Sequence, residues 1–206
     1  MRAAASGIVL AGGRAQRFGR DKLAEPLDDR PLLHHAIRAL ATVCREVIVV
    51  GPVGGLDPLL PRDVAVPVQV VADPRPFARP LVGLGAGAER ASESLVVVVG
   101  GDMPWIEPAV IRTMLRRLAD SDDTYRYDVE HGVALELGGQ AQPLPLVLDR
   151  NAAVSAAADL AASGTSSLRG LINALTIAVV PEAAWRGLDP EGRTLRDVDR
   201  PGDMMP

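Results

Sequence analysis

The sequence has few of the residues on which several classes of function depend. Its 206 residues include a single cysteine, Cys44, which excludes an internal disulfide and a multi-cysteine metal site. Aromatic residues make up 3% and the formal net charge is −4, which argues against a stacking platform for single strands and against a basic nucleic-acid-binding surface. No apolar run approaches the ~18 residues of a transmembrane helix. We therefore expect no nucleic-acid partner and no membrane partner.

The first residues offer no sign of an export signal. Residues 1–5 lead directly into a predicted strand, which leaves no room for the apolar segment of a signal peptide. We therefore expect a cytoplasmic protein. Cys44 precedes an apolar strand and is expected to be a small buried hydrophobe.

Apolar runs alternate with helical patterns through the first 120 residues. The β-branched run at 47–50 and the valine-rich run at 95–99 are continuous, as expected of strands buried on both faces. Further elements are expected as strands at 6–10 and 68–71, and as helices at 31–43, 81–88 and 108–118. This alternation predicts an α/β fold with three layers and a mostly parallel, Rossmann-like sheet.

The rest of the chain departs from this alternation. Residues 133–137 and 144–148 flank Gly138-Gly139 and predict a small β-hairpin, in which Pro143 and Pro145 place the second strand at an edge or make it irregular. The remaining expectations are a helix 152–162 capped by Asn151, a helix capped by Ser166-Ser167, a strand at 177–180 and a short strand before the acidic tail. The length favours a single domain over 1–206.

The loop after the first predicted strand has the composition of a phosphate-binding segment. Residues 8–22 read IVLAGGRAQRFGRDK, so a glycine pair and three arginines follow the strand and lead to Lys22, the one lysine of the chain. Backbone amides and cations at such a position bind phosphates. Neither the dinucleotide motif G-x-G-x-x-G nor the P-loop motif fits this spacing. The alternative interpretation is a solvated lysine after an ordinary loop.

Carboxylates follow other predicted strands. Asp73 follows the third strand, Asp102 the fourth, and Asp197 and Asp199 lie in the tail. Ligands of open parallel sheets bind at the carboxyl ends of strands, and Mg²⁺ takes one or two carboxylates with phosphate oxygens and water. The competing interpretations are a helix cap for Asp102, an Asx turn for Asp73 and an exposed acidic turn for the tail.

The segment LAGGRAQRFGRDK resembles the signature L-A-G-G-x-x-x-R-M/F-G-x-D-K of a nucleotidyltransferase family, and within it the molybdenum cofactor guanylyltransferase type. The resemblance extends over most of the chain through Pro31-Leu32-Leu33, residues 80–84, Gly101-Asp102-Met103-Pro104, Gln142-Pro143-Leu144 and Ser167-Leu168-Arg169. It implies a nucleotidyltransferase-type fold with a nucleotide-binding half (1–120) and an acceptor-binding half (121–206). It also implies Mg²⁺-dependent transfer of GMP from GTP to molybdopterin, with release of pyrophosphate and with transient contact to maturation proteins of molybdoenzymes.

The resemblance also implies roles for individual residues. The catalytic residues would be Arg17, Lys22 and Asp102: Arg17 and Lys22 would neutralise the triphosphate, and Asp102 would hold Mg²⁺. The nucleotide would in addition contact Leu10, Ala11, Gly12, Gly13 and Asp73. The tail aspartate Asp199 would complete the metal site with Asp102, with Asp197 as the alternative.

Two segments depart from the family pattern. Gly51-Pro52 stands where an asparagine is often found after the second strand, and Asp197-Val198-Asp199 replaces the usual N-V-N. Related cytidylyltransferases often carry an acidic tail, so CTP remains an alternative to GTP. A sugar-phosphate nucleotidyltransferase and a non-catalytic nucleotide-binding protein are also compatible with these residues.

Overall fold

The computed structural model describes residues 4–12, 21–52, 56–73, 80–120 and 129–204. Within these residues, seven strands form one sheet in the order β5-β4-β1-β6-β8-β7-β9. These are β1 (Ala5–Leu10), β4 (Glu46–Gly51), β5 (Val68–Ala72), β6 (Leu95–Gly100), β7 (Gly132–Leu137), β8 (Gln140–Asp149) and β9 (Ile177–Val180). A separate two-stranded ribbon pairs β2 (Pro26–Leu27) with β3 (Arg30–Pro31).

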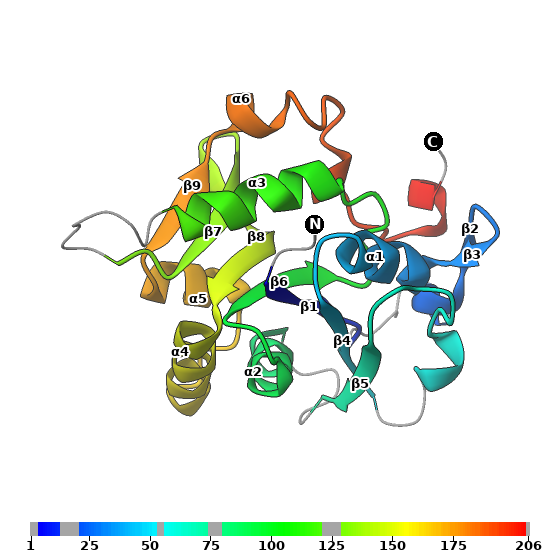
Figure 1. The fold of residues 1–206 in the computed structure, drawn as a ribbon, viewed down its shortest axis with the longest axis horizontal. Helices are drawn as coiled ribbons and strands as arrows, with labels where there is room; N and C mark the ends of the chain where they lie inside the picture. The colour runs from blue at the N-terminus through cyan, green and yellow to red at the C-terminus, as the bar shows by residue number, and fades with distance from the viewer. Residues whose placement is uncertain (1–3, 13–20, 53–55, 74–79, 121–128, 205–206) are drawn as a thin grey trace.

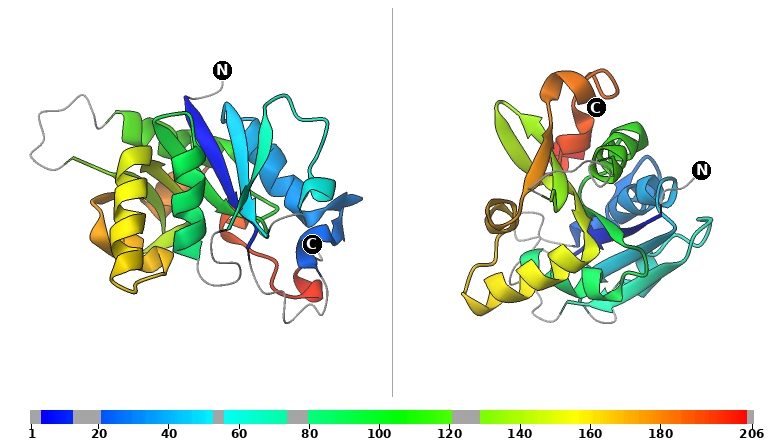
Figure 2. Two further views of the ribbon diagram at one scale, coloured as in Figure 1. Left: turned by 90° about the horizontal axis from the view of Figure 1, so that it is seen from below. Right: turned by 60° about the vertical axis from the view of Figure 1, so that its left-hand side comes forward.

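Helices cover both faces of the sheet (Figures 1 and 2). One face carries α1 (Leu32–Ala41), α3 (Pro108–Ala119) and α6 (Glu182–Trp185), and the other carries α2 (Pro80–Arg90), α4 (Arg150–Ala162) and α5 (Leu168–Ala174). Short 3₁₀ turns are η1 (Lys22–Ala24), η2 (Asp57–Leu59), η3 (Arg193–Leu195) and η4 (Pro201–Met204). The predicted three-layer α/β fold is confirmed.

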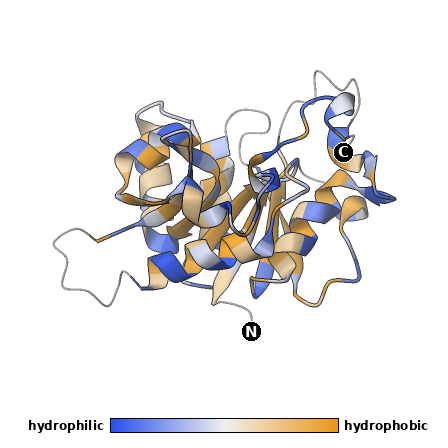
Figure 3. Cartoon of the chain, turned by 90° about the horizontal axis from the view of Figure 1, so that it is seen from above, coloured by the Kyte–Doolittle hydropathy of each residue, from blue (hydrophilic) through white to orange (hydrophobic). Residues whose placement is uncertain are grey.

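The core consists of two apolar clusters, one on each face of the sheet. The central strands are mostly apolar, as Figure 3 shows in orange, because helices cover both of their faces. Cys44 is fully buried, as expected, and burial raises the pKa of its thiol to about 12. No helix in the described part of the chain combines the length and the apolar character needed to cross a bilayer.

Parallel pairing of β1, β4, β5 and β6 brings the ends of these four strands to one edge of the sheet. In the register of the sheet, Leu10 of β1 lies opposite Val50 of β4 on one side and opposite Gly100 of β6 on the other. The segments that follow these strands therefore emerge side by side. This edge is where the predicted site residues are expected to meet.

The predicted hairpin forms, and of the two alternatives predicted for its second strand, an edge position or an irregular one, the structure shows the irregular one. Gly138 and Gly139, at φ 59° and 76°, make the two-residue turn between β7 and β8. Strand β8 lies between β6 and β7, and pairs with β6 only through residues 146–149. Both prolines precede that stretch, so their missing N–H groups are not needed for pairing with β6. The predicted irregularity is present as a register shift between Ala134 and Glu136.

Two local predictions are wrong. Helix α4 begins at Arg150, because the side chain of Asp149, not Asn151, accepts the N–H of Ala152. The short strand predicted before the acidic tail is replaced by η3. There the buried carboxylate of Asp189 accepts two successive backbone N–H groups, at 3.0 and 2.7 Å, and holds the chain in a turn.

Candidate active site

The segments after β1 and β5 meet on one side of the sheet edge. A Cβ atom at Gly12 would lie 2.9 Å from Oδ2 of Asp73, so the carboxylate occupies the space that any larger residue at position 12 would need. Asp73 is 7% exposed, and its N–H donates to the carbonyl of Gly51. The glycine thus lets a buried carboxylate approach the backbone that follows β1.

Lys22 links the first loop to the end of β6 and to the tail. Its Nζ donates to Oδ2 of Asp102 at 2.8 Å and to the carbonyl of Val198 at 2.8 Å, and lies 3.5 Å from Oδ1 of Asp199. Asp21 fixes the start of η1 by accepting the N–H of Leu23, whose side chain is buried. The lysine is therefore held by local structure, with its ammonium directed at carboxylates that lie far away in sequence.

The tail contributes two carboxylates because its central residue is anchored. Val198 is fully buried, packs against Leu27 and Leu32, and donates its N–H to the carbonyl of Asp102 at 2.9 Å. In an extended segment, successive side chains point to opposite sides. Burying Val198 therefore leaves the side chains of Asp197 and Asp199 on the side away from that apolar cluster.

Asp102, Asp197 and Asp199 form an acidic cluster, in which one carboxylate oxygen from each residue lies within 4.8 Å of the other two. Loss of hydration, together with the charges of Asp102 and Asp199, raises the pKa of Asp197. The donor set is carboxylate oxygen, which suits Mg²⁺ and lacks the nitrogen and sulfur ligands preferred by zinc. These residues therefore fit a magnesium ion.

The structure brings together most of the predicted site residues that it describes. Lys22, Asp102 and Asp199 are in mutual contact or close approach, whereas Asp73 lies with Gly12 on the β5 side. Leu10 and Ala11 lie at the same edge, since the Leu10 carbonyl accepts the N–H of Gly101 and Ala11 donates to Val50. Gly13 and Arg17 fall outside the described residues.

Sequence reasoning missed one element of the site and weighed another only as an alternative. The carbonyl of Val198 as an acceptor for Lys22 was not anticipated, and Asp197 joins Asp199 in the cluster instead of replacing it. The signal was present in the pattern Asp197-Val198-Asp199, because an apolar residue between two acidic residues indicates one buried side chain and two that point away from it.

Known proteins resemble this chain in sequence and in fold. The family model of the MobA-like NTP transferase domain matches residues 7–179. The chain belongs to this family. A probable molybdenum cofactor guanylyltransferase of Chloroflexus aggregans is 31% identical to this MobA-like transferase over 202 residues, which cover 97% of the chain and 91% of the relative.

Solved structures share the fold of this MobA-like transferase. Molybdopterin-guanine dinucleotide biosynthesis protein A from Archaeoglobus fulgidus superposes with a TM-score of 0.76 at 16% identity, covering 97% of this chain and 94% of that protein. A 2-C-methyl-D-erythritol 4-phosphate cytidylyltransferase from Thermus thermophilus superposes at 0.66 with 18% identity and coverages of 99% and 96%. The fold is thus common to proteins named for different nucleotides, and does not by itself select the base.

Neutralising one carboxylate of the acidic cluster should stabilise the MobA-like transferase without metal and reduce the further stabilisation that Mg²⁺ gives it. Asp197→Asn removes a charge that is repelled by two neighbours, so we expect the melting temperature in chelator to rise by about 2–4 °C. The increase in melting temperature on adding Mg²⁺ should shrink, because a ligand oxygen with full charge is lost. Thermal melts with chelator and with Mg²⁺ measure both effects. An unchanged response to Mg²⁺ would mean that Asp197 is not a ligand.

Proposed function

We propose that this MobA-like nucleotidyltransferase transfers GMP from GTP to the phosphate of molybdopterin, in a reaction that depends on Mg²⁺ and releases pyrophosphate. The observation that carries the proposal is the convergence of Lys22 with the acidic cluster at the sheet edge where the first loop ends. GTP is favoured as donor by the full-length relative named as a guanylyltransferase.

In the proposed reaction an oxygen of the acceptor phosphate attacks the α-phosphorus of GTP. The bond from the α-phosphorus to the oxygen that bridges to the β-phosphate breaks, and pyrophosphate leaves with that electron pair. Such transfers need alignment and charge neutralisation more than proton transfer. Lys22 would leave Asp102 to contact the α-phosphate, where its compact ammonium binds one pair of oxygens.

The other residues of the site would hold the nucleotide. The backbone of Leu10, Ala11 and Gly12 would contact guanine and ribose, with Asp73 beside the base or ribose. Gly13 and Arg17, outside the described residues, are proposed to wrap and neutralise the triphosphate.

The proposed metal site is made by the acidic cluster. Asp102 and Asp199 would hold Mg²⁺, with Asp197 as a third oxygen donor, and the bound ion supplies positive charge to the phosphate oxygens.

The proposal is tested by offering the enzyme each ribonucleoside triphosphate in turn with Mg²⁺ and molybdopterin, and measuring pyrophosphate. We expect release with GTP to exceed release with the other three nucleotides by at least about tenfold. Release with CTP alone would reassign the protein as a cytidylyltransferase. Nucleotide binding without release of pyrophosphate from the nucleotide in the presence of any acceptor, a sugar phosphate included, would show a non-catalytic nucleotide-binding protein.

A further inference from the structure

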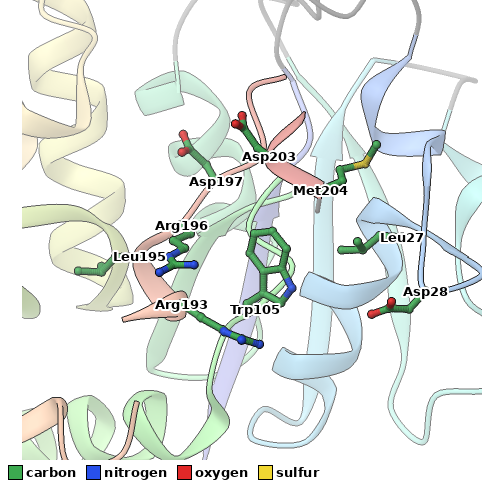
Figure 4. Close-up of a pocket in the computed structure, with 9 residues that line it drawn as sticks. All are labelled: Leu27, Asp28, Trp105, Arg193, Leu195, Arg196, Asp197, Asp203 and Met204. Atoms are coloured by element: carbon green, nitrogen blue, oxygen red, sulfur yellow. The ribbon is translucent and has the colours of Figure 1, made fainter. Parts of the chain in front are cut away.

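The end of the tail, residues 198–204, is anchored at both of its ends. Val198 is fully buried at one end, and Met204 at the other end packs against the same apolar cluster, which contains Leu27 and Val198. Figure 4 shows the side chain of Met204 on the side of Leu27. Asp199 lies between the two anchors, so the shape of the turn between them decides where its carboxylate stands.

Asp203 closes this turn with its side chain. Its Oδ2 accepts the N–H of Asp199 at 2.9 Å and the N–H of Arg200 at 2.7 Å, and its own N–H donates to the carbonyl of Arg200 at 3.0 Å. A carboxylate at the third position of a helical turn that accepts the N–H of the residue before the turn is one half of a capping box. Asp203 holds this position in η4, whereas Arg200, directly before η4, has no side-chain oxygen for a cap. One carboxylate therefore fixes the backbone at Asp199.

The side chain of Asp199 depends on this backbone for its direction. It is 54% exposed, so packing does little to hold it. A half-exposed side chain loses rotamer freedom when it binds a metal ion, and this loss is smaller when the backbone already directs it to the ion. The backbone does so here, because one oxygen of Asp199 lies within 4.8 Å of oxygens of Asp102 and Asp197.

Asp203 is not itself a member of the acidic cluster. It lines the same cavity as Asp197 and Trp105 (Figure 4), and so lies beside the cluster. In the part of the chain that the structure describes, however, the carboxylates close enough to share one ion are those of Asp102, Asp197 and Asp199. Oδ2 of Asp203 is already the acceptor of two N–H groups. Its contribution to the site is therefore made through the backbone of Asp199.

We propose that Asp203 is a positioning residue of the metal site: by holding the N–H groups of Asp199 and Arg200, it directs the carboxylate of Asp199 toward an ion bound at Asp102. This inference rests on the proposed function, and adds to it a residue that acts on the metal without touching it. Because the role is geometric, loss of the acceptor oxygen matters more than loss of the charge.

The test measures the Mn²⁺ affinity of the full chain without nucleotide, by paramagnetic resonance of free Mn²⁺. Asp203→Ala removes the acceptor and should weaken Mn²⁺ binding about tenfold, the lower end of the range for residues that orient metal ligands. Asp203→Asn keeps an acceptor oxygen and removes the charge, and should remain within about threefold of the wild type. Equal weakening in both variants would mean that Asp203 acts through its charge, and would overturn the proposal.

Asp149→Ala is the matched control, because Asp149 caps a helix in a similar way at a distant place. It accepts the N–H of Ala152 at the start of α4, and it lies opposite Leu95, at the other end of β6 from Asp102. We expect this variant to lose about 2–4 °C in melting temperature and to keep the wild-type Mn²⁺ affinity. If Asp149→Ala weakened Mn²⁺ binding as much as Asp203→Ala, the effect would come from general stability and the proposal would be wrong.

The Mg²⁺ dependence of turnover is a second readout that general destabilisation does not move. In Asp203→Ala the Mg²⁺ concentration for half-maximal turnover should rise about tenfold, as the Mn²⁺ affinity falls. At saturating Mg²⁺, kcat and the KM for GTP should remain within about twofold of the wild type, because the nucleotide contacts are unchanged. A lower kcat with an unchanged Mg²⁺ requirement would contradict a role in metal binding.

The positioning role and the proposed function fail in different ways. If Asp102→Asn weakens Mn²⁺ binding and Asp203→Ala does not, the positioning role is wrong and the metal site stands. If Asp203→Ala weakens Mn²⁺ binding but the wild-type enzyme releases no pyrophosphate with any nucleotide and acceptor, the positioning role stands and the proposed reaction is wrong.

Discussion

Replacing Asp102 with asparagine is expected to lower kcat by on the order of 10²–10³-fold, the range seen when one electrostatic partner of a transition state is removed. Asp102 is hydrogen-bonded to Lys22, and one of its carboxylate oxygens lies within 4.8 Å of oxygens of the two tail carboxylates, so it takes part in both interactions. Asparagine keeps the shape and one acceptor oxygen but loses the charge that a metal ion needs. Pyrophosphate release with saturating nucleotide measures the effect.

The fold should tolerate Asp102→Asn. The side chain is 28% exposed, and the tail remains anchored by Val198, whose N–H bonds to the backbone carbonyl of Asp102 and not to its side chain. We therefore expect a change of less than about 1 kcal/mol in the free energy of unfolding. Asp159→Asn, on the exposed surface of α4, is the matched control and should leave both turnover and stability unchanged. Wild-type turnover in Asp102→Asn would exclude Asp102 as a metal ligand.

Lys22→Ala is expected to reduce turnover by on the order of 10²-fold or more while hardly changing stability. The ammonium pairs with Asp102 and with the more exposed Asp199, and ion pairs whose carboxylates reach water contribute little to folding. Lys22→Arg keeps the charge but presents a planar fork, and should restore only part of the activity. Turnover and melting temperature, measured on the same preparations, separate the two effects. Parallel loss of both would mean that the lysine is structural.

The Lys22→Ala and Asp102→Asn variants should move metal affinity in opposite directions. In the structure the ammonium of Lys22 lies among the carboxylates that would bind Mg²⁺. Lys22→Ala removes this competing cation and should tighten binding of Mn²⁺, used as a probe, whereas Asp102→Asn should weaken it. Paramagnetic resonance of free Mn²⁺ reports both affinities without any catalysis. Weaker Mn²⁺ binding in both variants would contradict the expectation that Lys22 and the metal ion compete for the same carboxylates.

Local patterns were sufficient for the elements of the first half, and the resemblance of LAGGRAQRFGRDK to a nucleotidyltransferase signature was sufficient for the type of reaction. The continuous apolar runs at 47–50 and 95–99 predicted two of the four parallel strands because burial on both faces leaves no place for polar residues. Since parallel strands end at one edge, the residues after them had to converge, and the placement of Lys22 and Asp102 in one site follows from that rule, although their direct hydrogen bond was not predicted. The sequence left the position of β8 open, at an edge or irregular, because pairing depends on distant strands. The prolines of β8 are compatible with a central position because its pairing with β6 begins only at Leu146.

The sequence by itself determined the α/β fold, the glycine and lysine loop, and the carboxylates that follow the strands, since each depends on neighbouring residues or on strand direction. Only the tertiary structure decided that Asp197 and Asp199 both face Asp102, because burial of Val198 against Leu27 and Leu32 fixes the orientation of the tail. It also decided that Arg193 and Arg196 share a cavity with Trp105, which lies far from them in the chain. Contacts of this kind arise from packing between segments, which local sequence patterns do not encode.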